Sequence, residues 1–397
     1  MRLSQGQPGE SEFDRGILVT SMRRVIVIAS VGLFWTAVYL ALDFSYTIFF
    51  VAKERAARVP NPLYHHGLAP NFRGTDSWAT LQHRLFTNSL GFMDATVREV
   101  PARSEFHRVV LIGDSFTEGV GLPFEDTFAG MLFSAGQNSS AQIEFLNAAV
   151  ISYSPVIYYK KIRALFEQGL KFDEVIVFSD LTDVRDEASS YFCIDDDPRY
   201  ARYCPFWDRP VINQLGTYLK HRFSLTHTLL GLVKSMLRIA RLSVSAYAGE
   251  PRHAEGTWPF AANYEPLGIE GGIERSLKNM GRLSAFLQNH QIALTIVVYP
   301  HPTQLASRDN NTRQAAMWRE FCAGRCKAFI DLFPAFIAEA EANQDWQRRL
   351  FIPSDAHYNR EGNAVMFREL SKSLLPPAAG PRHLPAPGNE RANSGGR

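Results

Sequence analysis

The chain has 397 residues, enough for one large domain with additions. Its formal net charge of +2 at pH 7 is nearly neutral and its basic residues are scattered, which gives no basis for a polyanionic partner. No nucleic-acid-binding motif is present, so we expect no nucleic-acid partner.

A long apolar segment follows a polar N-terminal tail, residues 1–24. Residues 25–52 contain a single formal charge, Asp43, and about 20 apolar residues suffice to cross a bilayer as a helix. A cleaved signal peptide, the main alternative, would normally have a shorter apolar region ending at a small-x-small site. We therefore predict a transmembrane anchor over 25–52. Basic residues flank it on both sides, so the charge bias leaves its orientation open: Arg15, Arg23 and Arg24 before it, and Lys53, Arg55 and Arg58 after it.

The four cysteines lie in two close pairs, Cys193 with Cys204 and Cys322 with Cys326. Four cysteines allow three connectivities, and we predict the two local disulfides. Four free buried thiols are the alternative. Because disulfides need an oxidising compartment, the cysteines and the anchor together predict a body outside the cytoplasm, either periplasmic or extracellular.

Residues 53–84 are predicted to be a linker, because Pro60, Pro62 and Pro70 interrupt regular structure. The adjacent His65 and His66 fall within it. With no third ligand candidate nearby in the sequence, we expect these two histidines at the surface rather than in a metal site.

From Arg108 onwards, apolar strand patterns alternate with helical ones. This alternation predicts an α/β fold, a three-layer α/β/α arrangement around a parallel sheet. The expected strands are 109–112, 143–146, 175–178, 293–298 and 328–330, and the expected helices are 127–134, 156–168, 273–290 and 313–321.

An insertion over about 188–266 interrupts this alternation. Within it, 211–248 has helical length and carries apolar residues at helical spacing together with several cations. We favour an amphipathic helical hairpin packed on the core. The alternative is a lid, or a surface that lies against anionic lipid headgroups. Residues 377–397 are rich in Pro, Gly, Ala and Asn and are predicted to be disordered.

The run Val109 to Gly119 contains the motif Gly113-Asp114-Ser115-Phe116 directly after a buried strand. Open α/β sheets bind ligands beyond the carboxyl ends of their strands. A turn at this position can aim the Ser115 hydroxyl into a crevice, with free backbone N–H groups beside it.

This motif resembles block I of the SGNH (GDSL-like) hydrolases. The segments Thr87–Phe92 and Asp355–Asn359 are similar to sequences that accompany it, so the resemblance covers 85–376. It implies the SGNH/flavodoxin-like sheet and a serine hydrolase in which Ser115 is the nucleophile and a late histidine with a nearby aspartate activates it. It implies neither a metal nor an organic cofactor.

A serine hydroxyl is a poor nucleophile at neutral pH and needs a base that a third group orients. His357 and Asp355 can supply both roles from one loop. Many members of the family have three residues from Asp to His, which would place Ser354 in the aspartate position. Because the Asp-x-His version also occurs in relatives, we assign the orienting role to Asp355.

The oxyanion hole departs from the family pattern at two positions. Ser152 stands where block II usually has a glycine, five residues after Asn147, and Thr182 stands where block III usually has an asparagine. The backbone N–H groups of Ser115 and Ser152 can still donate, but a threonine hydroxyl is shorter than an asparagine amide. Losing one such donor typically costs about 10²–10³ in turnover.

Other polar residues near these blocks are candidate substrate contacts. Asp114, Asp180 and Asp183 could order the crevice, and the last two could instead cap the following segment. His301 follows a strong strand and also reaches the carboxyl edge, although a surface loop position is an alternative.

The sequence thus predicts an anchored, extracytoplasmic serine esterase or O-acyltransferase that acts on acyl esters of carbohydrate or lipid. The alternative is a catalytically weak glycan-binding or scaffold protein of an envelope assembly, suggested by the missing block III asparagine.

Overall fold

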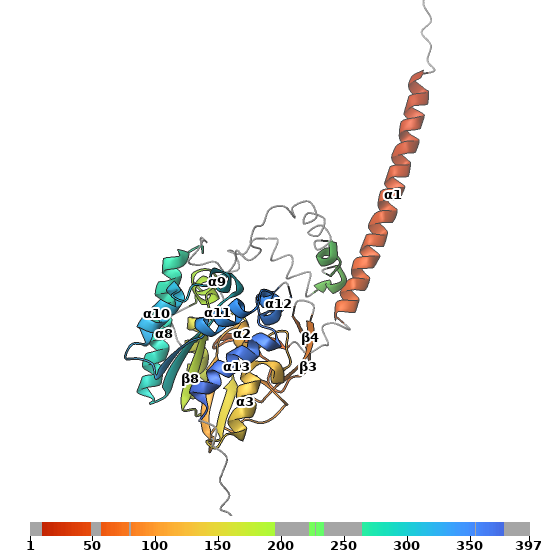
Figure 1. Cartoon of the computed structure of the whole chain (residues 1–397). Helices are drawn as coiled ribbons and strands as arrows, with labels where there is room; N and C mark the ends of the chain where they lie inside the picture. Colours follow the sequence, from red (N-terminus) through yellow and green to blue (C-terminus); the bar gives the residue numbers. More distant parts are fainter. Residues whose placement is uncertain are drawn as a thin grey trace, which may run out of the picture. The chain divides into compact units, whose positions relative to one another are not determined.

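A computed structural model of the chain describes residues 10–48, 57–78, 81–194, 222–226, 228–233, 264–353 and 355–376. It divides into two compact units, 1–56 with 206–250, and 57–205 with 251–397. The second unit is the α/β body and holds the candidate site (Figure 1).

The α/β body is built on an eight-stranded sheet in the order β10-β9-β8-β6-β7-β5-β4-β3. Neighbours from β10 to β7 pair in parallel, whereas β5, β4 and β3 extend the sheet by antiparallel pairing. The strands are β3 (Arg73–Trp78), β4 (Leu81–Thr87), β5 (Met93–Asp94), β6 (His107–Ile112), β7 (Ile143–Asn147), β8 (Glu174–Ser179), β9 (Ala293–Val298) and β10 (Ala328–Asp331).

Helices cover both faces of the sheet. α3 (Phe128–Asn138) and α13 (Arg360–Leu374) contact each other on one face, and α4 (Pro155–Glu167) contacts α8 (Gly268–Asn289) on the other (Figure 1). The five parallel strands, counted along the chain, run 2-1-3-4-5 across the sheet, the flavodoxin-like order. The predicted α/β/α class with a parallel sheet is confirmed, and each strand and helix predicted from the alternating pattern of the body is present within a few residues of its predicted bounds.

The remaining helices are short and connect these layers. They are α2 (Ser115–Glu118), η2 (Phe124–Asp126), α5 (Thr182–Arg185), the π-helical turn η3 (Asp186–Ser190), α9 (Pro302–Ser307), α10 (Arg313–Cys322), α11 (Phe333–Ala342) and α12 (Trp346–Leu350).

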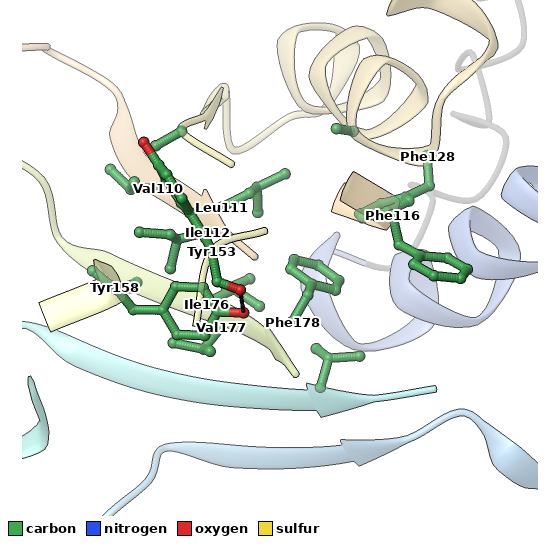
Figure 2. Close-up of a cluster of buried hydrophobic side chains, with 14 of the residues drawn as sticks. Val110, Leu111, Ile112, Phe116, Phe128, Tyr153, Tyr158, Ile176, Val177 and Phe178 are labelled. Atoms are coloured by element: carbon green, nitrogen blue, oxygen red, sulfur yellow. Dashed lines mark hydrogen bonds between the residues drawn. The ribbon is translucent and has the colours of Figure 1, made fainter. Parts of the chain in front are cut away.

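The core lies around the two central strands. β6 and β8 are apolar runs of Val, Ile and Leu that are buried on both faces, as expected of parallel strands between helix layers. Figure 2 shows Val110, Ile112 and Phe178 in this cluster, and all three side chains are 0% exposed. Full burial of a side chain of this size stabilises the fold by roughly 1.5–3 kcal/mol. A well-packed core therefore holds the strand end at which Ser115 lies.

The linker predicted over 53–84 is wrong from residue 57 onwards, where the chain is folded. β1 (Arg58–Asn61) and β2 (His65–Leu68) form an antiparallel hairpin, and β3 and β4 add two strands to the main sheet. Pro60 lies in the two-stranded hairpin, where an edge strand tolerates a residue without an N–H. The prolines therefore mark edges and turns of the folded body.

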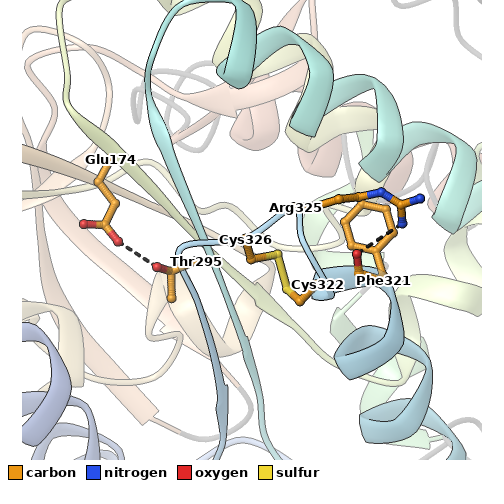
Figure 3. The surroundings of a disulfide bond; sticks show 6 residues. All are labelled: Glu174, Thr295, Phe321, Cys322, Arg325 and Cys326. Carbon is orange, nitrogen blue, oxygen red and sulfur yellow. Dashed lines mark hydrogen bonds between the residues drawn. A yellow bond between two sulfur atoms is a disulfide. The ribbon is translucent and has the colours of Figure 1, made fainter.

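The predicted disulfide between Cys322 and Cys326 is present and closes the turn between α10 and β10 (Figure 3). Beside it, Arg325 donates to the carbonyl of Phe321 at 3.1 Å, and its guanidinium lies 5.0 Å from the centre of that ring. Cys193 is also disulfide-bonded. Cys204, its predicted partner, lies outside the described residues.

The first unit contains helix α1 (Glu10–Tyr46), whose segment Arg23–Tyr46 is long and apolar enough to cross a membrane. The helix begins inside the tail predicted over 1–24, and its apolar segment starts within two residues of the predicted start of the anchor at residue 25. The end of the predicted anchor, 49–52, and the predicted disordered tail, 377–397, lie outside the described residues.

The lone charge of the apolar segment has partners in the insertion. The Asp43 carboxylate is buried and accepts hydrogen bonds from the backbone N–H groups of Leu225 and Thr226, at 2.9 and 2.8 Å, and from the Thr226 hydroxyl at 2.6 Å. It thereby caps the short apolar helix Ser224–Val233. This part of the insertion belongs to the unit of α1, and the packing of a hairpin on the core stays a prediction. The rest of 211–248 lies outside the described residues.

Candidate active site

Ser115 is the first residue of α2, directly after the turn that ends β6. Space at Gly113 is restricted, because a Cβ there would lie 2.3 Å from the Thr117 hydroxyl and 3.0 Å from the Phe178 carbonyl oxygen. The Asp114 carboxylate caps α2 by accepting from the N–H of Phe116 at 3.0 Å. The first N–H groups of a helix have no partner within it, so this turn presents both the Ser115 hydroxyl and a backbone donor.

Three side chains form a continuous hydrogen-bonded chain at this turn. The Oγ of Ser115 lies 2.7 Å from Nε2 of His357, and Nδ1 of His357 lies 2.5 Å from Oδ1 of Asp355. The Asp355 Oδ1 also accepts from the backbone N–H of His357 at 2.9 Å, which fixes the loop. The structure therefore brings together three residues that are 242 positions apart in sequence at their extremes. Ser354, the alternative orienting residue, lies outside the described residues.

The Asp355 carboxylate is held ionised. Burial pushes its pKa upwards, but hydrogen bonds from the His357 ring and backbone, the nearby imidazole charge and a hydrogen bond from Trp78 outweigh burial and lower the pKa to about 2. Nε1 of Trp78 donates to Oδ2 of Asp355 at 3.1 Å, and the indole meets the His357 ring edge-on. An ionised carboxylate fixed at both oxygens is suited to orient His357 and to stabilise its protonated form.

The Ser115 hydroxyl opens into a pocket of about 280 Å³ at the carboxyl edge of the sheet. Its lining is Trp78, Asp114, Ser115, Phe116, Ser152, Thr182, Arg185, Asp186, His301, Ala356 and His357. Among the described residues, no group of three or more His, Cys, Asp or Glu side chains is placed to hold a metal ion.

Ser152 also lines the pocket and has a left-handed backbone conformation, with a φ of 57°. That conformation costs a non-glycine residue roughly 1–2 kcal/mol, which explains why glycine is usual at this position of block II. Asn147 holds the start of the loop, because its Nδ2 donates to the carbonyl of Thr117 at 2.8 Å.

Thr182 lines the pocket, but its hydroxyl is engaged by carboxylates. Its Oγ1 lies 2.7 Å from Oδ1 of Asp180 and 3.4 Å from Oδ2 of Asp114. Burial raises the pKa of Asp114 well above its ordinary value, and the charge of Asp180 adds to this effect. Burial also raises the pKa of Asp180. The Thr182 hydroxyl thus lies between two buried carboxyl groups, each of which burial shifts towards its protonated form.

The other predicted contacts divide between the pocket and the core. His301 lines the pocket and is buried, so the surface-loop alternative is wrong; it begins α9 in a reciprocal cap with Gln304. Asp183 is buried behind the pocket and accepts from the Ser179 and Tyr158 hydroxyls at 2.5 and 2.8 Å. Its role in the structure is to satisfy buried hydroxyls rather than to face the pocket.

Several pocket residues are missed by sequence analysis. Trp78 lies in the segment predicted as a linker, and Arg185 and Asp186 follow the block III position by three and four residues. Burial raises the pKa of Asp186 to about 6, against the opposing charge of Arg185. The sequence signal for Arg185 and Asp186 is their spacing of three and four residues from Thr182, which places all three residues on one face of a helix.

Comparisons with known proteins give remote structural likenesses. No family model matches the chain, and no curated protein matches it. The structure is similar to that of a lipolytic protein of the G-D-S-L family from Desulfitobacterium hafniense (14% identity, 67% of this chain and 98% of that chain, TM-score 0.36). It is also similar to a psychrotrophic esterase from Pseudoalteromonas (11% identity, 67% and 96% coverage, TM-score 0.35) and to a catalytic mutant of an acetylxylan esterase from Geobacillus stearothermophilus (10% identity, 68% and 95% coverage, TM-score 0.36). The function proposed below therefore rests on the geometry of the site.

Proposed function

We propose that the chain is a serine esterase or O-acyltransferase of the SGNH type. The observation that carries this proposal is the hydrogen-bonded series from Ser115 through His357 to Asp355, which opens into a pocket. A loop serine whose only role was to cap a helix would not need an imidazole oriented by a carboxylate. The series supports nucleophilic catalysis with His357 as the base.

The proposed reaction has two halves. Oγ of Ser115 attacks the ester carbonyl while Nε2 of His357 takes the hydroxyl proton, and the bond to the alcohol then breaks as His357 returns that proton to the alcohol oxygen. The backbone N–H groups of Ser115 and Ser152 would hold the oxyanion. The acyl group on Ser115 then passes to water or to an acceptor hydroxyl, which His357 deprotonates in turn.

The pocket favours a small acyl group on a polar alcohol. The polar side chains of Asp114, Thr182, Arg185 and Asp186 line the space of about 280 Å³ together with Ser115. This lining suits an acyl ester of a carbohydrate better than a long lipid chain. Lipid esters remain the second substrate class that an assay should include.

Covalent labelling by a fluorophosphonate tests the nucleophile. We expect the full-length wild type to be labelled and Ser115→Ala to remain unlabelled, while Ser371→Ala, a serine on the exposed side of α13, is labelled like the wild type. A folded wild type that resists labelling would contradict the proposal and favour the scaffold function. The engagement of Thr182 by Asp180 is the observation behind that second candidate.

Product analysis separates hydrolysis from transfer. Turnover of p-nitrophenyl acetate is measured with and without sugar acceptors at equal concentration. A new acylated sugar supports transfer, whereas acetate as the only product with every acceptor supports hydrolysis.

We further propose that Arg23–Tyr46 anchors the protein in a membrane with the body outside the cytoplasm. The capping of Ser224–Val233 by Asp43 supports this, because the carboxylate, the one acidic group of the segment, accepts hydrogen bonds from Leu225, Thr226 and Thr47. Leu229, Leu230 and Leu232 of that helix are more than half exposed, which suits contact with acyl chains. Resistance to carbonate extraction, together with the absence of free thiols in the denatured, unreduced protein, is the expected result. Release by carbonate, or four free thiols, would contradict the assignment.

A further inference from the structure

We infer that His66 is a positioning residue of the oxyanion hole, which it serves by binding the peptide group that carries the Ser152 N–H. This inference rests on the proposed function, because it assigns a role within the same site. The sequence predicts that His66 lies at the surface of a linker. The structure instead places it half-buried on β2, against the loop that contains Ser152.

Hydrogen bonds hold three successive peptide groups of this loop. The N–H of Ile151 donates to Oε2 of Glu118 at 2.7 Å, the carbonyl of Ile151 lies 2.8 Å from Nε2 of His66, and the carbonyl of Ser152 accepts from the Tyr191 hydroxyl at 2.6 Å. The carbonyl bound by His66 belongs to the same peptide as the Ser152 N–H. His66 therefore sets the orientation of the proposed oxyanion donor directly.

The contact determines how the histidine pair is protonated. A carbonyl oxygen only accepts, so Nε2 of His66 must carry a hydrogen. Burial, with smaller effects from Lys161 and Arg58, lowers the pKa of His66 to about 4, so the ring is neutral near pH 7 and its Nδ1 is an acceptor. Nδ1 of His65 lies 2.7 Å from that Nδ1 and must therefore be the donor. His65 thus donates a hydrogen bond to His66, and His66 donates one to the Ile151 carbonyl.

A hydrogen bond accepted by a peptide carbonyl polarises the whole amide and strengthens its N–H as a donor. The hydrogen bond from His66 also helps to hold Ser152 in a strained backbone conformation. Its φ is positive, which glycine adopts freely but serine does not. His66 is itself fixed, because its carbonyl accepts from the Tyr153 hydroxyl at 2.5 Å and its ring packs against the Tyr153 ring. The hairpin β1–β2 thereby supplies rigidity that the loop sequence lacks.

The test compares His66→Gln with His66→Met in the full-length protein. The two side chains are similar in shape, but only the glutamine amide can donate to the Ile151 carbonyl. We expect the Met variant to lower kcat for p-nitrophenyl acetate by about 10–100-fold, less than the loss of a whole donor. We expect its KM to change less than about twofold. An aryl boronic acid binds as a tetrahedral adduct on the serine, so the affinity of the Met variant for this inhibitor should fall in parallel with kcat. The Gln variant should recover most of the loss, and His83→Leu, at another buried histidine of the body, should behave as the wild type.

Three results would overturn the inference while leaving the proposed function intact: an unchanged kcat in His66→Met, equal losses in the Met and Gln variants, or a rise in KM alone. If the Met variant does not fold, ¹⁵N spectra of the wild type decide, with the His66 signal assigned by its loss in His66→Gln. Protonation of His66 at Nε2 supports the inference and protonation at Nδ1 overturns it. A wild type that neither turns over the ester nor reacts with a fluorophosphonate refutes the proposed function, and the inference falls with it.

Discussion

The two sides of the pocket are built in different ways. On the base side, one short loop supplies both His357 and Asp355, and Asp355 binds the backbone as well as the ring of its neighbour. On the oxyanion side, the loop that contains Ser152 is held by residues from β2, α2 and the segment after η3, which are His66, Glu118 and Tyr191. The base side is thus local in sequence, and the oxyanion side is assembled from distant segments.

This difference explains where each side tolerates change. A local Asp-x-His loop depends on few residues, so its motif survives as a recognisable pattern. A loop held by many distant partners can lose its usual glycine, because the surrounding contacts over-determine its backbone. We therefore expect single substitutions on the base side to affect catalysis most, and those on the oxyanion side to affect stability and catalysis together.

The largest effect is expected from Asp355→Asn. The amide keeps the shape of the carboxylate but cannot stabilise the protonated imidazole or enforce the productive tautomer, so kcat should fall by about 10³–10⁴-fold. The free energy of unfolding should also fall, because the lowered pKa of Asp355 shows that its ionised form stabilises the folded protein. Ester turnover and urea unfolding measure the two quantities. The matched control Asp345→Asn removes an exposed carboxylate and should leave both quantities unchanged. A fall in kcat of less than about tenfold would show that Asp355 is not the orienting group.

On the oxyanion side, Glu118→Gln should cost both stability and turnover. The Glu118 carboxylate is 2% exposed and binds the Arg58 guanidinium as well as the N–H of Ile151. The substitution weakens two charge-assisted hydrogen bonds at a buried carboxylate, while Arg58 keeps Asp76 as a partner, so the free energy of unfolding should fall by about 2 kcal/mol. Glu125→Gln breaks an exposed pair with Arg84 and should cost less than about 1 kcal/mol. Equal costs in the two variants would refute a special role for the buried pair.

A buried lysine beneath the same loop makes stability depend on pH. Nζ of Lys161 donates to the carbonyl of Ala148 at 2.7 Å and to the Tyr153 hydroxyl at 3.1 Å, and burial lowers its pKa to about 7, against the attraction of Glu118. Above that pKa the folded protein holds Lys161 neutral while the unfolded chain stays protonated, so the unfolded state binds more protons and stability rises with pH.

Between about pH 7 and pH 9, the free energy of unfolding of the wild type should therefore rise by about 2 kcal/mol relative to Lys161→Met. Urea unfolding, followed by near-ultraviolet circular dichroism of the body, measures this difference. Lys171→Met, at an exposed lysine, should keep the rise. A difference that is flat or falls across this range would mean that Lys161 remains charged in the folded protein.

The same contrast describes how far the sequence predicts the structure. The central strands could be predicted because β6 and β8 each contain an uninterrupted apolar run, 109–112 and 175–178. The residues of the hydrogen-bonded series could be predicted because each lies in a short motif. The hairpin β1–β2 could not, since its strands have four residues each and contain proline, glycine and paired histidines. Its role depends on pairing and on contacts across 85 positions, from His66 to Ile151, and local patterns do not encode such contacts. Trp78 was missed for the same reason.

The smallest expected effect concerns the residue at which the oxyanion loop departs from its usual sequence. At the φ of 57° adopted by Ser152, glycine avoids the crowding between Cβ and the backbone that any other side chain meets. Ser152→Gly should therefore be more stable than Ser152→Ala by about 1 kcal/mol, although glycine is normally the less stabilising of the two residues in a folded chain because of its greater unfolded-state entropy. Thermal unfolding of the two variants measures this difference without any assumption about the serine hydroxyl.

Both variants keep the backbone N–H of residue 152, and His66, Glu118 and Tyr191 still hold the loop. The turnover of each variant should therefore stay within about threefold of the wild type. A large loss of turnover in Ser152→Gly, despite equal or greater stability, would mean that the serine side chain itself contacts the substrate. The loop would then bind substrate through this side chain in addition to donating its backbone N–H to the oxyanion.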